Sequence, residues 1–213
     1  MTVWQNQPII RVRKGRYLFT FFINISAGVG GKCSMEGKRL TSYAMEELEC
    51  PKCGHKHSLK KYKVINVTEK AKLKEEIMKN RLYQFSCEEC EYMAPLTYDS
   101  LYVDSRRNIM IYMAPVMNAE IKAEITELEQ EKGIDKRLVD NINDLKEKIM
   151  IADNHLDDRV IEIIKIMYID QMKKEMEDDT LLNILFDYNR DNYCFLVFFQ
   201  KKGIGKIPLT REF

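Results

Sequence analysis

The chain has 213 residues, enough for one substantial domain or two small ones, each with a hydrophobic core. Hydrophobic residues make up 45% and charged residues 31%, which is the composition of an ordinary soluble globular protein. The 34 Lys and Arg residues nearly balance the 33 Asp and Glu residues, and residues 118–213 are acidic on balance. This balance argues against a protein that wraps nucleic acid by overall charge.

The N-terminal segment, residues 1–45, resembles a secretory signal in outline. Basic residues from Arg11 onward precede an apolar run from Tyr17 to Ile25, and small residues up to Ala27 follow. The apolar run is much shorter than the roughly 20 residues of a membrane-spanning helix. We therefore expect no membrane span in this segment.

We interpret the Arg11–Ala27 region as part of an extension that arises from a start codon placed too early. Gly30-Gly31-Lys32 can be encoded by a purine-rich stretch like a bacterial ribosome-binding site, and Met35 and Met45 offer later starts. A true signal or anchor and an ordered N-terminal element are the alternatives. Residues 1–45 are thus expected to be disordered or untranslated.

Four cysteines form two C-x-x-C pairs, Cys50 with Cys53 and Cys87 with Cys90. Two such pairs supply the four thiolates of a tetrahedral structural zinc site, and a closed set of four leaves no position for substrate. We expect these four residues to hold one Zn²⁺ ion. Iron is not excluded by the ligand type, and an empty site or a redox dithiol are further alternatives.

The cysteine usage also indicates a compartment. Six cysteines, four of them in metal-type pairs, fit a reducing environment better than a secreted disulfide framework, so we expect a cytoplasmic protein. The other two, Cys33 and Cys194, have no evident partner. Cys194 lies in an apolar run that predicts a buried strand.

Between and after the cysteine pairs, the pattern predicts short strands and one helix. Residues 59–67 predict a strand, and Leu73 and Ile77 predict the buried side of a short helix that Thr68 caps and Asn80 ends. Further strands are predicted at residues 82–85, 92–98 and 108–113.

The second half of the chain predicts helices followed by a hairpin. The capping-box spacing of Asp144 and Glu147 predicts the start of a helix with Leu145 and Ile149 turned inward. A helix from Leu156 onward is apolar around much of its circumference and is expected deep in the core. The pattern also predicts a helix around residues 121–133 and a hairpin of residues 181–188 and 193–200.

Several motifs occur in a fixed order over roughly residues 46–200, and none lies in the first 45. They are Cys50-Pro51-Lys52-Cys53-Gly54, the strand end Val64–Val67, the run Leu82–Cys90, Leu101–Asp104, Asp144–Ile149 and Leu156–Glu162. Together these motifs resemble one family, the CpXC-domain proteins of bacteria and archaea. The resemblance implies a cysteine-rich domain that binds metal and has no established activity.

The second cysteine pair departs from the pattern of the first at two positions. Glu88 stands where Pro51 follows Cys50, and Glu91 stands where Gly54 follows Cys53. The residue after the second cysteine of a metal-binding loop commonly needs a positive φ, which glycine adopts freely and glutamate does not. We expect a cost of about 1–2 kcal/mol at Glu91.

Other groups have a functional and a structural interpretation. His55 and His57 are either additional metal ligands or, as we expect, exposed turn and strand residues. Asp153–Arg159 contains His155, Asp157 and Asp158, which are either an acid/base or cation site or, as we expect, mainly a helix cap. Residues 60–63 interleave lysines with a tyrosine and are either a nucleic-acid contact or a solvated strand face.

These observations predict an α+β protein, in which a zinc-ribbon-like antiparallel β module with a folded insert (residues 46–117) precedes a helix and hairpin part (118–200). Residues 201–213 are expected to be a tail or an edge strand. The expected function is that of a zinc-binding adaptor or regulatory module with a protein partner. An enzyme with a site at His155, Asp157 and Asp158, and weak nucleic-acid binding by the basic middle segment, are the alternatives.

Overall fold

The computed structural model describes residues 39–175, 179–189 and 192–209. The expected extension up to residue 38, with its signal-like region Arg11–Ala27 and Cys33, lies outside these ranges. Helices and strands are mixed along the described chain, which confirms the α+β class. No helix in these ranges is long and apolar enough to cross a membrane.

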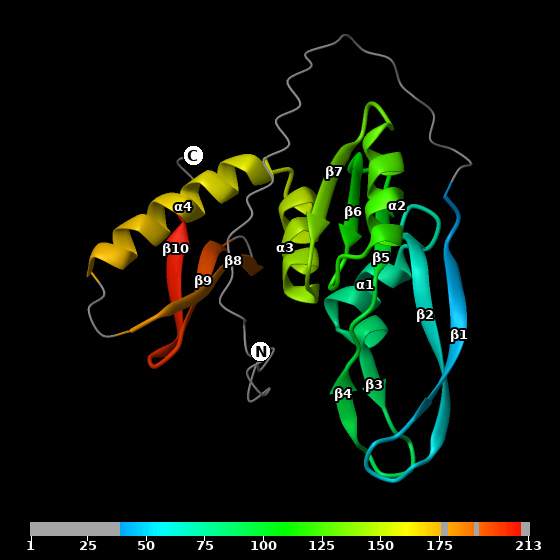
Figure 1. Cartoon of the computed structure of the whole chain (residues 1–213). Helices are drawn as coiled ribbons and strands as arrows, with labels where there is room; N and C mark the ends of the chain where they lie inside the picture. The colour runs from blue at the N-terminus through cyan, green and yellow to red at the C-terminus, as the bar shows by residue number, and fades with distance from the viewer. Residues whose placement is uncertain (1–38, 176–178, 190–191, 210–213) are drawn as a thin grey trace. The chain divides into compact units, whose positions relative to one another are not determined.

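A five-stranded sheet, ordered β1-β2-β5-β6-β7, is the centre of the first part (Figure 1). Pairs β1–β2 and β5–β6 are antiparallel, whereas β2–β5 and β6–β7 are parallel. The sheet is therefore mixed rather than wholly antiparallel, because long connections carry the chain from β2 to β5 and from β6 to β7. Its strands are β1 (Ser42–Glu49), β2 (Lys56–Asn66), β5 (Ser100–Asp104), β6 (Ile109–Met113) and β7 (Asp135–Val139).

Helices cover both faces of this sheet. On one face, α2 (Ala119–Glu129) packs through Ile121 and Leu128, and on the other α1 (Lys72–Met78) and α3 (Ile142–Asp153) pack together. Side chains of β5 and β6 alternate between the two cores, so that all residues of both strands are buried. Strands covered on both faces need mostly apolar residues, which β6 has at every position and β5 has between Ser100 and Asp104.

A second, three-stranded sheet has the order β10-β9-β8 and is antiparallel throughout. Helix α4 (Asp158–Glu175) packs on it around buried residues such as Ile161, Phe186 and Phe195. The predicted hairpin is confirmed as β8 (Leu181–Asn189) and β9 (Asn192–Phe199), and Cys194 is buried in β9 as expected. The segment predicted as tail or edge strand forms β10 (Gly203–Leu209) at one edge.

Helix α3 belongs to both cores. Its residues Leu145 and Ile149 pack under the five-stranded sheet, whereas Ile151 packs with α4 and the second sheet. The expected division after residue 117 therefore falls inside the first sheet, since α2, β7 and α3 follow it. Similarly, β1 begins at Ser42, ahead of the expected domain start at residue 46.

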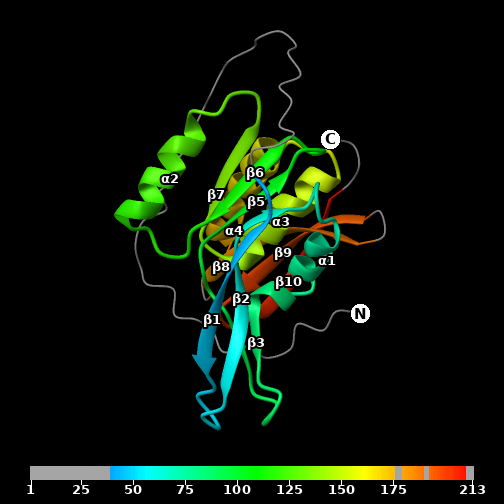
Figure 2. The ribbon, with the colours of Figure 1, turned by 90° about the vertical axis from the view of Figure 1, so that its right-hand side faces the viewer.

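The insert between β2 and β5 is folded, as predicted. It contains α1, the 3-10 turn η1 (Arg81–Tyr83) and a small antiparallel hairpin of β3 (Gln84–Ser86) and β4 (Met93–Pro95). The β1–β2 and β3–β4 loops lie side by side at one end, away from α2 and α3, in both views (Figures 1 and 2). We call this region, residues 45–61 and 84–96, the ribbon limb.

Candidate metal centre

The two loops of the ribbon limb have the same backbone architecture. In each, the N–H of the first cysteine donates to the carbonyl five residues later, and the N–H four residues after that cysteine donates back to the cysteine carbonyl. The four bonds are Cys50 N to His55 O (2.8 Å), Gly54 N to Cys50 O (2.8 Å), Cys87 N to Tyr92 O (2.8 Å) and Glu91 N to Cys87 O (3.0 Å). This repeat turns both pairs of sulfurs toward a common point.

The four predicted cysteines meet there. All four Sγ atoms lie within 4.8 Å of one another. Between the loops, the Sγ atoms of Cys50 and Cys90 lie 3.6 Å apart, as do those of Cys53 and Cys87. Tetrahedral zinc with Zn–S bonds of about 2.3 Å separates its sulfurs by about 3.8 Å, so the cluster has the size that a metal ion requires. The four cysteines thus form a site that can bind a metal ion.

The thiols differ in acidity because their surroundings differ. Burial raises the pKa of Cys50, but the backbone N–H groups of Cys53 and Lys52 outweigh it and bring the pKa to about 7. The backbone N–H of His55 lowers the pKa of Cys53, yet burial and the three neighbouring thiols raise it to about 12. Four thiolates this close repel one another, and a bound cation removes that obstacle to ionisation.

The apolar support of the site is small. Phe85 and the two cysteines Cys50 and Cys87 are buried, and they pack with the partly buried side chains of Leu59, Cys90, Tyr92 and Leu96. The Nζ atom of Lys52 lies 3.4 Å from the carbonyl oxygen of Cys90 and links the two loops. A cluster of this size supplies little hydrophobic stabilisation, which is the situation in which a structural metal replaces a core.

His57 lies closer to the cysteines than predicted. Its Nε2 atom is 3.2 Å from Cys87 Sγ, and its side chain is half-buried rather than exposed. The prediction was wrong because His57 is in phase with Leu59 on the face of β2 that packs against Phe85. His55, by contrast, is exposed as expected. The period-2 alternation from His57 to Leu59 is a sequence signal that could have placed His57 on this buried face, although not against Cys87.

The two loops differ at the position after the second cysteine. Gly54 has φ +74° and Glu91 has φ +57°, so both residues adopt the left-handed conformation. The backbone conformation expected at Glu91 is therefore present. A glutamate in this region is strained where glycine is not.

The acidic stretch Asp153–Arg159 does not form a shared cleft. The carboxylate of Asp157 accepts from the backbone N–H of Arg159 (3.0 Å) and from its guanidinium, which is a local cap at the start of α4. Burial would raise the pKa of Asp158, but ion pairs with Arg137 and Lys148 hold it below its usual value.

His155 lies apart from these carboxylates. Its Nε2 atom is 2.6 Å from Nη1 of Arg107, and its φ is +56°. The three predicted groups of the enzyme alternative thus have separate cationic partners. They do not converge on one space where a substrate would contact them together.

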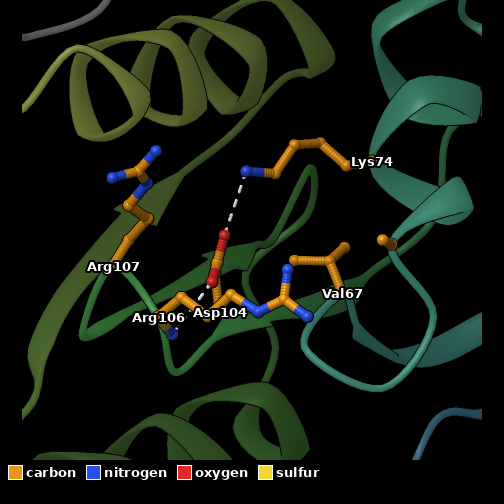
Figure 3. A pocket seen from close by; sticks show the side chains of 6 residues that line it. Val67, Lys74, Asp104, Arg106 and Arg107 are labelled. Carbon is orange, nitrogen blue, oxygen red and sulfur yellow. Dashed lines mark hydrogen bonds and ion pairs between the residues drawn. The ribbon is translucent and has the colours of Figure 1, made fainter.

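A cavity of about 310 Å³ lies near Arg107 (Figure 3). In it the amino group of Lys74 points at the buried carboxylate of Asp104 (3.0 Å) and also pairs with Asp153 (2.6 Å). Arg107 pairs with Asp153 as well (3.3 Å). These ion pairs tie α1, the β5–β6 turn and α3 together, which is a structural role.

The basic stretch at residues 60–63 is divided between the two faces of β2. Lys60 lies over the ring of Tyr43 (4.9 Å), whereas Lys61 pairs with Glu46 (2.5 Å). Tyr62 packs against Tyr43, with ring centroids 5.7 Å apart. Alternation along the strand therefore prevents these lysines from forming one continuous cationic face.

Comparison with known proteins agrees with this geometry. The family model described as CpXC protein matches residues 48–165, more than half of the chain. This range runs from the end of β1 to the middle of α4 and contains the ribbon limb from residue 48 onward with all four cysteines, whereas β8, β9 and β10 follow it. Neither the curated proteins nor the solved structures gave a match. The chain therefore belongs to the CpXC protein family.

Proposed function

We propose that Cys50, Cys53, Cys87 and Cys90 hold one structural zinc ion, and that the protein works as a zinc-stabilised module that binds a protein partner. The observation that carries this proposal is the closed set of four sulfurs within 4.8 Å at the tip of a limb with a small apolar cluster. When bound, zinc supplies a four-way cross-link between the two loops. With four thiolates as ligands it keeps no open position for a substrate.

Zinc is favoured over iron by the structural role. A structural cross-link requires an ion that does not change its oxidation state, because its coordination geometry then stays the same. Zn²⁺ is such an ion. Thiolate ligation also requires a reducing surrounding, so the protein is proposed to act in the cytoplasm.

The partner is proposed to contact the ribbon limb or the strand edge beside it. Tyr43 and Met45 on β1 and Met93 on β4 are large apolar side chains that are 49%, 55% and 63% exposed. A contiguous apolar patch on a protein surface marks a protein contact, and we propose that Tyr43 and Met45, two positions apart on one face of β1, are part of such a patch. The divided lysines of β2 favour a protein over nucleic acid as the partner.

The metal part of the proposal is tested on the full chain, purified without chelator. We expect about one zinc per chain by elemental mass spectrometry and its loss in Cys87→Ser. Cys194→Ser removes a thiol from β9 and serves as the matched control, which should retain the metal. Absence of zinc from the wild type, or equal zinc in Cys87→Ser, would contradict a four-cysteine site.

Hydrogen exchange then tests whether the bound ion stabilises the ribbon limb or is bound there without stabilising it. In Cys87→Ser the amides of the ribbon limb should exchange faster, while those of β5 and β6 keep their protection because their core does not include the cysteines. The binding part is tested with Tyr43→Ser/Met45→Ser, which should keep the metal and lose cross-links to partner proteins in cells. Salt-sensitive binding of DNA or RNA by the purified protein would favour the nucleic-acid alternative instead.

A further inference from the structure

The imidazole of His57 is in contact with one of the four sulfurs. Its Nε2 atom lies 3.2 Å from Sγ of Cys87, which is within the range of an N–H···S hydrogen bond. Cys87 is 1% exposed, so this nitrogen reaches a sulfur that water scarcely touches. The contact joins β2 to the loop after β3, two segments that are 30 residues apart in the sequence.

The ring is held in place by its neighbours. It packs nearly perpendicular to the ring of Phe85, at a centroid distance of 5.3 Å and an interplanar angle of 82°. The ring of His55 also contacts it, at a centroid distance of 4.9 Å. The backbone of His57 is paired with Leu48 in the β1–β2 ladder. A side chain fixed by strand pairing and by a buried aromatic ring keeps its hydrogen-bond direction.

When the proposed metal is bound, the ionisation state of the Cys87 sulfur determines which atom donates in the His57–Cys87 hydrogen bond. A cysteine that ligates a metal is a thiolate, and a thiolate accepts hydrogen bonds without donating one. The proton must then be on Nε2 of His57. An N–H donor to a ligating sulfur withdraws charge from it and fixes its orientation, which is how groups around a metal site adjust its affinity.

We propose that His57 is a positioning residue of the metal centre: its Nε2–H donates to the Cys87 thiolate and slows loss of the metal. This inference rests on the proposed function, because it presumes that the four cysteines hold an ion. The residue acts through Cys87 and does not itself ligate, since the four sulfurs already complete a tetrahedral set.

Three variants of the full chain test the role of the ring nitrogen. His57→Phe keeps an aromatic side chain against Phe85 and removes the donor. His57→Gln restores an N–H donor on a side chain of similar reach. His155→Gln changes a histidine beside Arg107, whose ring makes no hydrogen bond to sulfur in the described part of the chain, and serves as the control.

Zinc affinity is measured by competition with a chromogenic chelator, and Co²⁺ is bound as a spectroscopic probe. We expect His57→Phe to bind zinc about 10–100-fold more weakly and to shift the thiolate-to-cobalt charge-transfer bands. His57→Gln should recover most of the affinity and the band positions. His155→Gln should match the wild type in affinity and band positions, and thermal unfolding of the remaining fold should be unchanged in the two His57 variants.

Each other outcome has a definite meaning. Wild-type affinity and bands in His57→Phe would overturn the inference and leave the four-cysteine site intact. Equal weakening in His57→Phe and His57→Gln would also overturn it, since the ring would then act by packing alone. A wild-type cobalt spectrum with the intensity of three thiolates would mean that His57 is a ligand. Failure of the wild type to bind either ion would reject the proposed function itself.

Discussion

Single residues decide how well each loop of the ribbon limb fits its conformation. Gly54 and Glu91 occupy equivalent places, because each donates its N–H to the first cysteine of its loop and each has a positive φ. Glycine reaches this region without a steric penalty, whereas a glutamate pays about 1–2 kcal/mol. The second loop therefore contains strain that the first loop does not.

We predict that Glu91→Gly tightens zinc binding about 2–5-fold. Relief of about 1–2 kcal/mol is partly offset by the larger entropy that glycine loses on folding, about 0.5–1 kcal/mol, and each 1.4 kcal/mol is tenfold in affinity. Gly54→Ala should weaken binding by a similar factor, because it introduces the same strain into the first loop. Chelator competition measures both.

The control for this prediction is Glu89→Gly. Glu89 lies in the same loop, and its replacement by glycine removes the same charge as Glu91→Gly. The φ of Glu89, however, is not positive. This change should give no gain in affinity. If Glu89→Gly and Glu91→Gly tightened binding equally, loss of a carboxylate near the thiolates would explain the effect, and backbone strain would not.

The secondary-structure elements show where sequence patterns were sufficient. The strand near residues 59–67, the inward faces of α1 and α3 and the β8–β9 hairpin follow directly from local periodicity. The four cysteines could also be assigned from spacing, because metal sites need fixed ligand geometry. His57 could not, since its contact depends on how two distant hairpins pack.

Other elements depend on tertiary context that the local pattern does not contain. The α4 helix is apolar over a wide arc and was expected deep in the core, yet Val160, Ile163 and Met167 are 48%, 51% and 66% exposed. That prediction was wrong because a single sheet covers only one side of the helix. Strands β5 and β7 were not predicted: β5 is short and covered on both faces, and β7 is polar at its start.

Helix starts were predicted less well than helix faces. Thr68 does not cap α1, and its Oγ1 accepts from the backbone N–H of Ser105 instead (2.8 Å). Asn141 rather than Asp144 caps α3: its side chain accepts from the N–H groups of Asn143 (2.9 Å) and Asp144 (3.0 Å). Asn141 and Asp144 are both of residue types that cap helices, but α3 begins at Ile142, so only Asn141 lies at the cap position.

The start of α3 has a consequence for pH dependence. Burial, together with the carboxylates of Glu147 and Asp140, raises the pKa of Asp144 from 3.8 to about 6. The folded state then binds a proton that the unfolded state has released between these two values, so this group's contribution to stability falls as pH rises through that window. Above about pH 6 the carboxyl of Asp144 is ionised in the folded state as well, and the cost of burying this charge lowers the free energy of unfolding in full.

We predict that Asp144→Asn increases the free energy of unfolding at pH 7.5 by about 1–2 kcal/mol, with the helix N-terminus reducing the gain. The hydrogen bond from Asn141 Nδ2 to the side chain of residue 144 (2.9 Å) survives the change. The advantage should largely disappear at pH 4, which urea unfolding at both pH values measures. Asp99→Asn, at an exposed site, is the control. A pH-independent difference would assign the effect to packing.

At the scale of the whole molecule, α3 joins two cores that are otherwise built from different elements. Leu145 and Ile149 pack in the core of the five-stranded sheet, and Ile151 packs in the core of the three-stranded sheet. The connection is also ionic: Glu147 of α3 pairs with Lys165 of α4 (2.5 Å) and accepts from the backbone N–H of Phe186 in β8. One side chain of α3 thus contacts two other elements, α4 and β8, and both charges of the ion pair are almost completely buried.

A buried pair of this kind is costly to break from one side. We predict that Lys165→Met lowers the free energy of unfolding by about 3–5 kcal/mol, because Glu147 is left buried without a counter-charge. Glu147→Gln/Lys165→Met removes both charges, and the glutamine oxygen can still accept from Phe186. The double variant should therefore recover most of the loss, as measured by urea unfolding. Losses that simply add in the double variant would mean that the pair is not coupled, and that shape rather than charge holds α4 against α3.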